Sequence, residues 1–324
     1  NIGEDPQFAI DAANLLVALK NVELCRPTFA NRVDNLVKTR TNYEPLKQVV
    51  DTLTHSVNIY DYYAAAAFAT FWPEQFEPKA NTILNNIINA PTTTYEGVIL
   101  PKAKLMCEPL LSATFYLPYN SNLMNLARTL YLAHEARYNA TGNYAAFTEG
   151  NPAGVATHYI WEWVVLPDGH TWVIQRDEFT AVQITPVIFL KAAVGLFALY
   201  NTQFTQNMVN DMVPDLRTST GYLEGKTEIG QIVSFSSDKT NGMIIGAARY
   251  AIDNNSSAPN PTQSTTPPSA TTAIPTPTST IIGTTTPNVV TGTSPSLDPA
   301  PTNSPTITSS PTDSPNPSLT ATTT

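Results

Sequence analysis

The run NIYDYYAAAAFATF (residues 58–71) carries a single charged side chain, Asp61, among alanines and aromatic residues. A helix of this composition has no polar face to turn toward water, so we expect it to be buried on almost all sides. Residues 122–138 differ, because their apolar side chains recur at helical spacing and leave a polar face for solvent. The sequence therefore predicts two kinds of helix, one buried and one amphipathic.

The two kinds of helix alternate along the chain. Nearly uncharged helices are predicted at residues 58–71, 108–116, 186–200 and 241–252. Amphipathic helices are predicted at residues 28–37, 74–88, 122–138 and 203–212. An inner ring of buried helices inside an outer ring predicts this alternation, whereas a solenoid of helix pairs would also require a fixed sequence period, which the chain lacks. We therefore expect a mainly α fold, an α/α toroid of paired helices, either complete or shortened.

Two segments interrupt the predicted helices. Residues 159–165 and 171–174, rich in tryptophan, valine and isoleucine, flank Pro167-Asp168-Gly169 and predict a small β-hairpin. Residues 91–101 predict a loop with a short strand. We therefore expect a small β-hairpin insertion in the helical fold.

The composition changes sharply at residue 254. Residues 254–324 are nearly all Thr, Ser, Pro, Asn and Ala, with no aromatic residue and more than half of the chain's 27 prolines. Such a segment cannot bury enough apolar surface to offset the entropy of ordering it. We expect an α/α-toroid domain at residues 1–253 and a disordered linker or stalk at residues 254–324.

Composition and charge exclude several partners. The net charge is −9 and no block of Lys or Arg is present, so nucleic acid is not an expected partner. The longest apolar run, residues 186–200, is interrupted by Lys191 and is shorter than the ~18–20 residues of a membrane span. The Thr/Ser/Pro-rich segment is typical of secreted or wall-exposed proteins, which predicts an extracellular or envelope-exposed location. The chain begins with Asn1 and shows no leader pattern, so we expect a processed chain or a fragment.

The cysteines and histidines give no sign of a metal or cofactor site. Cys25 and Cys107 lack the spacing of zinc or redox motifs, which leaves one disulfide or, preferably, two buried thiols. The four histidines form no HExxH pattern. We therefore predict no metal and no cofactor, and a monomeric chain.

Seven short stretches follow one another in order between about residues 11 and 250. They are IDAANLLVAL (10–19), CEPLL (107–111), AHEARYNATG (133–142), Thr148-Glu149, LKAAVGLFALY (190–200), GYLEG (221–225) and the helix start at Thr240-Asn241. Together they resemble the domain-of-unknown-function family catalogued as number 3131. That resemblance implies kinship with the six-hairpin, glucoamylase-like α/α-toroid glycosidases, and so sugar chemistry by analogy of fold.

The chain departs from the family pattern at two points. Members of the family carry further helices before the residue-11 element, so the toroid expected here is shortened. Gly150 stands where an acid is usual after Thr148-Glu149. The second difference keeps a degenerate, non-catalytic site open as an alternative.

Glu108 and Glu149 are the predicted catalytic residues. In a toroid the ligand cavity lies at the end where loops lead into the inner helices, and glycoside hydrolysis commonly uses two carboxyl groups across the scissile bond. Glu108 begins a buried helix just before Pro109, and Glu149 follows the longest helix. The alternatives are that Glu108 only caps its helix and that Glu149 is a solvated loop residue.

Eight further residues are predicted to contact the substrate because they lie near helix starts or on the intervening loops. They are Asp11, Trp72, Arg176, Asp177, Glu178, Tyr222, Glu224 and Asn241. Trp72 and Tyr222 are suited to stack on sugar rings. An ion-pair cluster on the rim is the alternative for residues 176–178, and a helix-terminal charge is the alternative for Asp11.

These features predict an exported carbohydrate-active protein. The expected partner is a polysaccharide or oligosaccharide, and the expected activity is that of a glycoside hydrolase or transglycosylase that uses a carboxylate pair. The alternative is a non-catalytic glycan-binding or structural envelope module with a degenerate toroid site.

Overall fold

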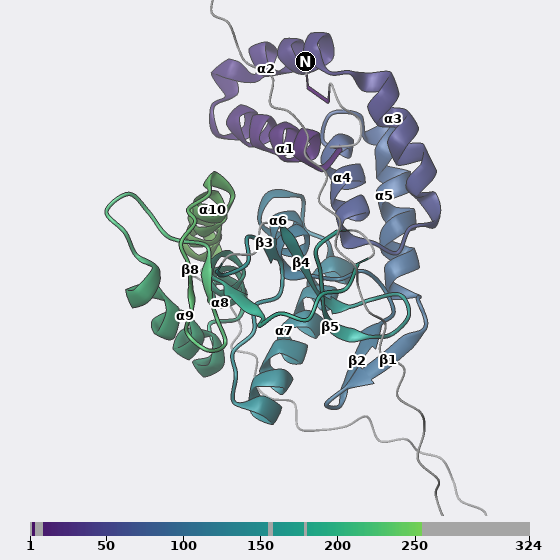
Figure 1. Ribbon diagram of the computed structural model, residues 1–324. Coiled ribbons are helices and arrows are strands. Elements are labelled where there is room, and N and C mark those ends of the chain that lie inside the picture. The colour runs from purple at the N-terminus through teal and green to yellow at the C-terminus, as the bar shows by residue number, and fades with distance from the viewer. Residues whose placement is uncertain (1, 4–8, 155–157, 178–179, 255–324) are drawn as a thin grey trace, which may run out of the picture. The chain divides into compact units, whose positions relative to one another are not determined.

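The computed structural model describes residues 2–3, 9–154, 158–177 and 180–254 (Figure 1). Glu178 and almost all of the predicted linker lie outside these residues. The described part is mainly helical with small antiparallel sheets, which confirms the predicted class. No helix in it is both long and apolar enough to cross a bilayer.

The described residues form ten α-helices. These are α1 (Ala9–Cys25), α2 (Ala30–Arg40), α3 (Tyr43–Thr52), α4 (Ile59–Ala69), α5 (Pro73–Ile88), α6 (Cys107–Tyr116), α7 (Ser121–Thr141), α8 (Leu190–Tyr200), α9 (Gln203–Leu216) and α10 (Asp238–Asn254). Short 3-10 turns lie at Pro27–Phe29 and Leu53–His55. Asn58 caps α4 by accepting a hydrogen bond from the backbone N–H of Tyr60, and Gly142 ends α7 with a left-handed backbone.

The helices pack in a row, with a second helix covering most members of it. Helix α1 packs on α4, α4 on α6, α6 on α8 and α8 on α10. Helices α5, α7 and α9 cover α4, α6 and α8, respectively. More than half of the residues of α4, α6 and α8 are buried, against about a third in the covering helices. The predicted alternation of buried and amphipathic helices is therefore present from α4 to α9.

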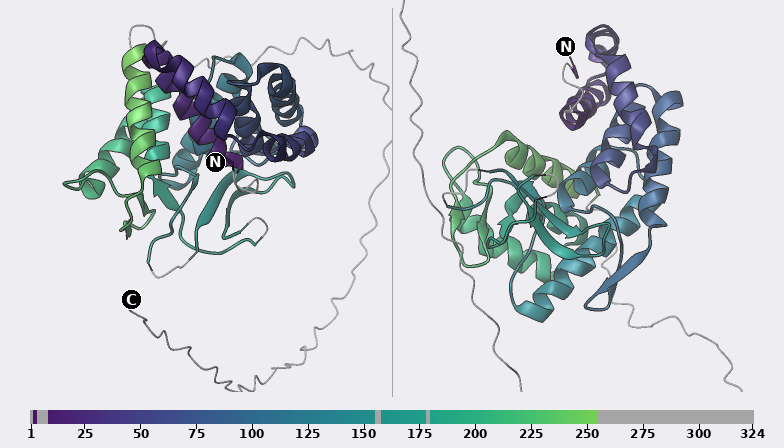
Figure 2. Two further views of the ribbon diagram at one scale, coloured as in Figure 1. Left: turned by 90° about the horizontal axis from the view of Figure 1, so that it is seen from above. Right: turned by 45° about the vertical axis from the view of Figure 1, so that its right-hand side comes forward.

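Helix α10 corrects one expectation. The sequence predicts a buried helix at residues 241–252, but Ile245 and Ile252 on α10 are largely exposed. Within the described part of the chain α10 packs mainly on α8 and α6, which cover one side of it. Seen from above (Figure 2, left), one end of the purple α1 lies beside the green α10.

The strands form three small antiparallel sheets. One is the hairpin of β1 (Thr92–Tyr95) and β2 (Val98–Pro101). The second has the order β3 (Glu149–Gly150), β4 (Ile160–Val165) and β5 (Thr171–Gln175), and the third has the order β6 (Val187–Phe189), β7 (Gly225–Thr227) and β8 (Ile232–Val233). The β4–β5 pair confirms the hairpin predicted around Pro167-Asp168-Gly169.

Strand β6 corrects the predicted start of a helix. The segment expected to be helical from residue 186 is extended at Val187–Phe189, and α8 begins at Leu190. Val187 and Ile188 are β-branched and pair with Thr227 and Lys226 of β7. Pairing with a strand distant in the sequence therefore replaces the first turn of the expected helix.

Both cysteines are free thiols, so the disulfide alternative is wrong. Cys107 is buried as expected, but Cys25 is exposed at the end of α1. Burial and the nearby Glu162 carboxyl raise the pKa of the Cys107 thiol well above its usual value. A thiol in this state is a poor nucleophile.

The native protein should therefore react with Ellman's reagent at one thiol only. We expect Cys25 to be modified and Cys107 to react only after denaturation, because the reagent needs an accessible thiolate. The Cys25→Ser variant should show no reactive thiol until it is unfolded. Modification of native Cys107 at the rate of Cys25 would contradict the assignment.

Candidate functional site

A cavity of about 450 Å³ opens between α1, α4, α6 and α10. Amide, hydroxyl and charged side chains line it together with apolar ones, among them Asn14, Asn21, Tyr63, Glu108, Ser112 and Lys239. This mixture offers many hydrogen-bond donors and acceptors in one concave space. We call this space the Glu108 cavity.

Glu108 lies in the first turn of α6 and is 6% exposed. Its backbone N–H donates to the Thr148 hydroxyl (3.1 Å), which joins the start of α6 to the segment before β3. Its carboxylate contacts the ammonium of Lys191 and lies 3.3 Å from Nζ of Lys239. Two ammonium groups therefore lie against the Glu108 carboxylate at the start of α6.

Glu149 lies in β3 and is also 6% exposed, so it is not a solvated loop residue. Its Oε1 atom contacts the ammonium of Lys239. Burial raises the pKa of Glu149, but Lys239, Lys191 and a hydrogen bond from Tyr60 outweigh burial and hold this pKa below its ordinary value. Glu149 is therefore ionised near neutral pH.

Lys239 of α10 bridges the two carboxylates. Because one ammonium contacts an oxygen of each acid, Glu108 and Glu149 are no further apart than the roughly 5–10 Å typical of paired carboxylates in glycoside hydrolases. Burial lowers the pKa of Lys239, but the two carboxylates raise it above its ordinary value. The structure thus brings together the two acids that the sequence singled out.

The sequence interpretation missed both lysines as site residues. Lys191 is 0% exposed in the first turn of α8, within the apolar segment 186–200. A lone lysine in such a segment must have a partner, because an unpaired buried charge is very costly. That signal was available in the sequence, although it does not identify Glu108 as the partner.

Glu108, Glu149, Lys191 and Lys239 together form what we call the acid–lysine cluster. Three tyrosines lie around this cluster. Burial, followed by the nearby carboxylates, raises the pKa of Tyr60 and Tyr159, and burial likewise raises the pKa of Tyr63. The Lys239 ammonium lies 5.9 Å from the centre of the Tyr159 ring. All three phenols are therefore protonated near neutral pH and can donate hydrogen bonds beside the acids.

Trp72 and Asp11 lie away from this cluster. Trp72 packs on Tyr43, with ring centres 5.1 Å apart, and on Phe71 and Phe76 where α4 leads into α5. None of these four aromatic residues lines the Glu108 cavity. Asp11 lies in the first turn of α1, whose Asn14 and Asn21 line the cavity instead.

Arg176 and Asp177 are not at a helix start, which corrects the sequence-based placement. They follow β5 in a bend, with about half of each side chain exposed, and their charged groups lie 3.7 Å apart. Asp177 also accepts a hydrogen bond from the backbone N–H of Thr180 (2.7 Å). An ion pair is the alternative interpretation given for these residues, and Glu178 lies outside the described residues.

Glu224 is buried just before β7 and fixes the segment that follows β3. Its Oε2 atom accepts hydrogen bonds from the backbone N–H (2.8 Å) and side-chain amide (3.3 Å) of Asn151. A side chain at Gly150 would meet the Phe189 ring, and its Cβ would lie 3.0 Å from the same Glu224 oxygen. The absence of an acid at position 150 therefore matches a lack of space there.

The side chain of Asn241 forms hydrogen bonds with the backbone of Tyr222. Its side-chain oxygen accepts a hydrogen bond from the Tyr222 N–H (2.9 Å), and its amide donates to the Tyr222 carbonyl (3.1 Å). These bonds hold the segment before β7 against the first turns of α10. Neither residue lines the Glu108 cavity.

Cys107 and His134 form a second buried polar pair. The Cys107 sulfur lies 3.7 Å from Nε2 of His134, and Nε2 also accepts a hydrogen bond from the backbone N–H of Phe147 (3.1 Å). Nδ1 of His134 therefore carries the proton and donates to the Leu130 carbonyl (2.7 Å). Burial lowers the pKa of His134 to about 4. The pair is neutral and differs from the ion pair of a cysteine nucleophile.

Comparison with known proteins gives one match. The model of a family described as "Protein of unknown function (DUF3131)" matches residues 7–254, which include every helix of the described structure. No curated protein and no solved structure matches the chain. The match covers well over half of the chain, so this protein belongs to the DUF3131 family.

Proposed function

We propose that this chain is an extracellular or envelope-exposed carbohydrate-active protein whose Glu108 cavity binds an oligosaccharide. Glu108 and Glu149 then cleave or transfer a glycosidic bond, and the row of helices is part of an α/α toroid. One observation carries the proposal: two buried carboxylates contact one ammonium beside a cavity rich in hydrogen-bonding groups. The shared ammonium keeps the two acids no further apart than the carboxyl pairs of glycoside hydrolases, which supports the proposal.

The two acids differ in their suitability for the two chemical roles. Glu149 has a lowered pKa, so it is the base that activates water or the nucleophile that attacks the sugar. Glu108 lines the cavity and is the candidate proton donor. This role requires Lys239 to leave Glu108 when a sugar binds, and the side chain of Lys239 is 36% exposed whereas that of Lys191 is 1% exposed. Lys239 is therefore the more accessible of the two lysines.

A specific observation also favours the non-catalytic alternative. Lys191 and Lys239 neutralise both carboxylates, whereas a proton-donating carboxyl needs a raised pKa. A site that stays in this state holds a glycan through hydrogen bonds without cleaving it. The same cavity then serves a binding module.

Substitution of the two acids distinguishes a glycan-cleaving enzyme from a glycan-binding module. If the protein is a hydrolase or transglycosylase, Glu108→Gln and Glu149→Gln should each lower sugar release or transfer from a glucan panel by about 10²–10⁴-fold. Both variants should still bind the glycan, because glutamine keeps the size and most hydrogen bonds of glutamate. Reducing-end assays and isothermal titration measure the two properties.

Glu77→Gln serves as the control, because Glu77 is an exposed residue of α5. It should leave both binding and turnover unchanged. Binding without turnover by the unsubstituted protein would select the binding module. A protein that neither binds nor cleaves any member of the panel would refute the proposal.

A further inference from the structure

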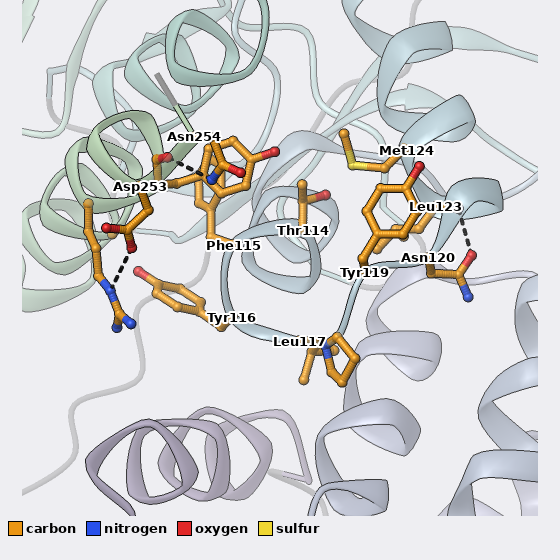
Figure 3. A pocket seen from close by; sticks show the side chains of 14 residues that line it. Thr114, Phe115, Tyr116, Leu117, Tyr119, Asn120, Leu123, Met124, Asp253 and Asn254 are labelled. Carbon is orange, nitrogen blue, oxygen red and sulfur yellow. Dashed lines mark hydrogen bonds and ion pairs between the residues drawn. The ribbon is translucent and has the colours of Figure 1, made fainter. Parts of the chain in front are cut away.

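A second hollow lies between α6, α7 and α10 (Figure 3). It has a volume of about 240 Å³ and is formed by the end of α6, residues 117–120, the start of α7 and the last turns of α10. Tyr116 and Arg249 line both this distal hollow and the Glu108 cavity. The two spaces therefore share part of their lining, and we call the two together the groove.

Helix α10 forms one side of the groove along its length. Its lining residues recur every three or four positions from Asp238 to Asn254, so they share one face of the helix. A helix of 17 residues spans about 25 Å. Gly242 leaves this face without a side chain, and a Cβ there would meet no atom within 4 Å, whereas the Tyr116 side chain of α6 packs directly on Gly246. The groove is thus longer than a single sugar, is open at Gly242 and is narrowed by Tyr116 at Gly246.

Aromatic side chains gather at the distal hollow. Tyr119 is 82% exposed, and it stands on the opposite side of the hollow from Asp253, beside Asn120 and Met124 (Figure 3). The Tyr116 hydroxyl donates to the Gly242 carbonyl (3.4 Å), which holds its ring where the two spaces meet. Exposed aromatic faces of this kind suit stacking on sugar rings.

We propose that this groove binds a linear glycan chain of several sugar residues. The glycan runs along α10, with one internal sugar residue beside Glu108 and Glu149 and more remote sugar residues on Tyr116 and Tyr119. The inference rests on the proposed function and adds the class of ligand, a polymer segment in place of a mono- or disaccharide. The inference also predicts that cleavage or transfer occurs at an internal bond of the glycan and not at its end.

The test compares Tyr119→Ala with Ile245→Ala. Ile245 is a matched control because it is 70% exposed on α10 and lines neither space. The probes are cello-, laminari- and malto-oligosaccharides from disaccharide to decasaccharide, with affinity measured by isothermal titration. We expect affinity to rise with chain length, and Tyr119→Ala to weaken decasaccharide binding by about ten-fold with progressively smaller losses for shorter chains. Ile245→Ala should match the unsubstituted protein at every length.

Two results would overturn the inference while the proposed function stands. The first is that the unsubstituted protein binds disaccharides and decasaccharides with equal affinity. The second is that Tyr119→Ala lowers the affinity by the same factor at every oligosaccharide length. In both cases the Glu108 and Glu149 variants would show their expected effects. If no oligosaccharide binds the unsubstituted protein, the proposed function fails and this inference fails with it.

Discussion

Replacement of Lys191 by methionine is expected to lower the free energy of unfolding by about 3–5 kcal/mol. Lys191 is 0% exposed, and its ammonium contacts the buried carboxylate of Glu108. Methionine has nearly the same length, so the substitution removes the charge without leaving a large cavity. Glu108 then keeps only Lys239 as a neighbouring cation, and an incompletely paired buried carboxylate destabilises the folded state.

A double-mutant cycle isolates the pair from the other effects. The Lys191→Met/Glu108→Gln variant should be more stable than Lys191→Met alone, because it no longer contains the incompletely paired carboxylate of Glu108. Lys20→Met is the surface control, since Lys20 forms a partly exposed pair with Glu23 that should contribute about 1 kcal/mol or less. Urea unfolding gives the free energies of the unsubstituted protein, the Lys191→Met and Glu108→Gln single variants and the double variant. If the effects of the Lys191 and Glu108 substitutions simply add, the two charges are not coupled in the fold.

The helices were predictable because their signals are local. The uncharged run that becomes α4 and the spaced apolar side chains of α7 each bury the face that the sequence pattern indicates. The β4–β5 hairpin follows from a turn sequence between two strand-forming runs. These elements need no knowledge of distant residues.

The corrected elements depend on distant partners. Val187 extends into β6 because β7 lies about forty residues further along the chain, and nothing near Val187 signals that pairing. Ile245 is exposed because the described part of the chain covers α10 mainly on the side of α8 and α6. Hydrophobic spacing shows which residues can be buried, but not whether a neighbour is there to bury them.

The site was predictable only in part for the same reason. Glu108 could be singled out because it begins a buried helix, and Glu149 because it follows the longest helix. Their separation depends on Lys239, which reaches both from α10 more than 85 residues away in the sequence. Charge pairing across helices leaves no periodic pattern, so the acid–lysine cluster emerges only from the packed structure.

Glu162→Gln should stabilise the folded protein near neutral pH. Glu162 of β4 is 0% exposed, and burial raises its pKa well above the ordinary value, with a smaller contribution from Glu228. Its Oε1 atom accepts a hydrogen bond from the backbone N–H of Val187 (2.8 Å), whereas its buried Oε2 atom has no hydrogen-bond partner among the described residues. Glutamine keeps the acceptor for Val187 and carries no charge, so we expect a gain of about 1–3 kcal/mol.

The pH dependence of this gain follows from the direction of the pKa shift. The folded state holds the Glu162 proton more tightly than the unfolded state, where the pKa is about 4.3. The stabilising effect of that proton is fully present below the unfolded pKa and is lost as pH rises through the folded pKa. Unfolding measured across this range should therefore show the glutamine variant and the unsubstituted protein converging in acid and diverging toward neutral pH. The exposed-site variant Glu77→Gln should show no such divergence, and a constant difference for Glu162→Gln at all pH values would mean that Glu162 does not change its protonation between the two states.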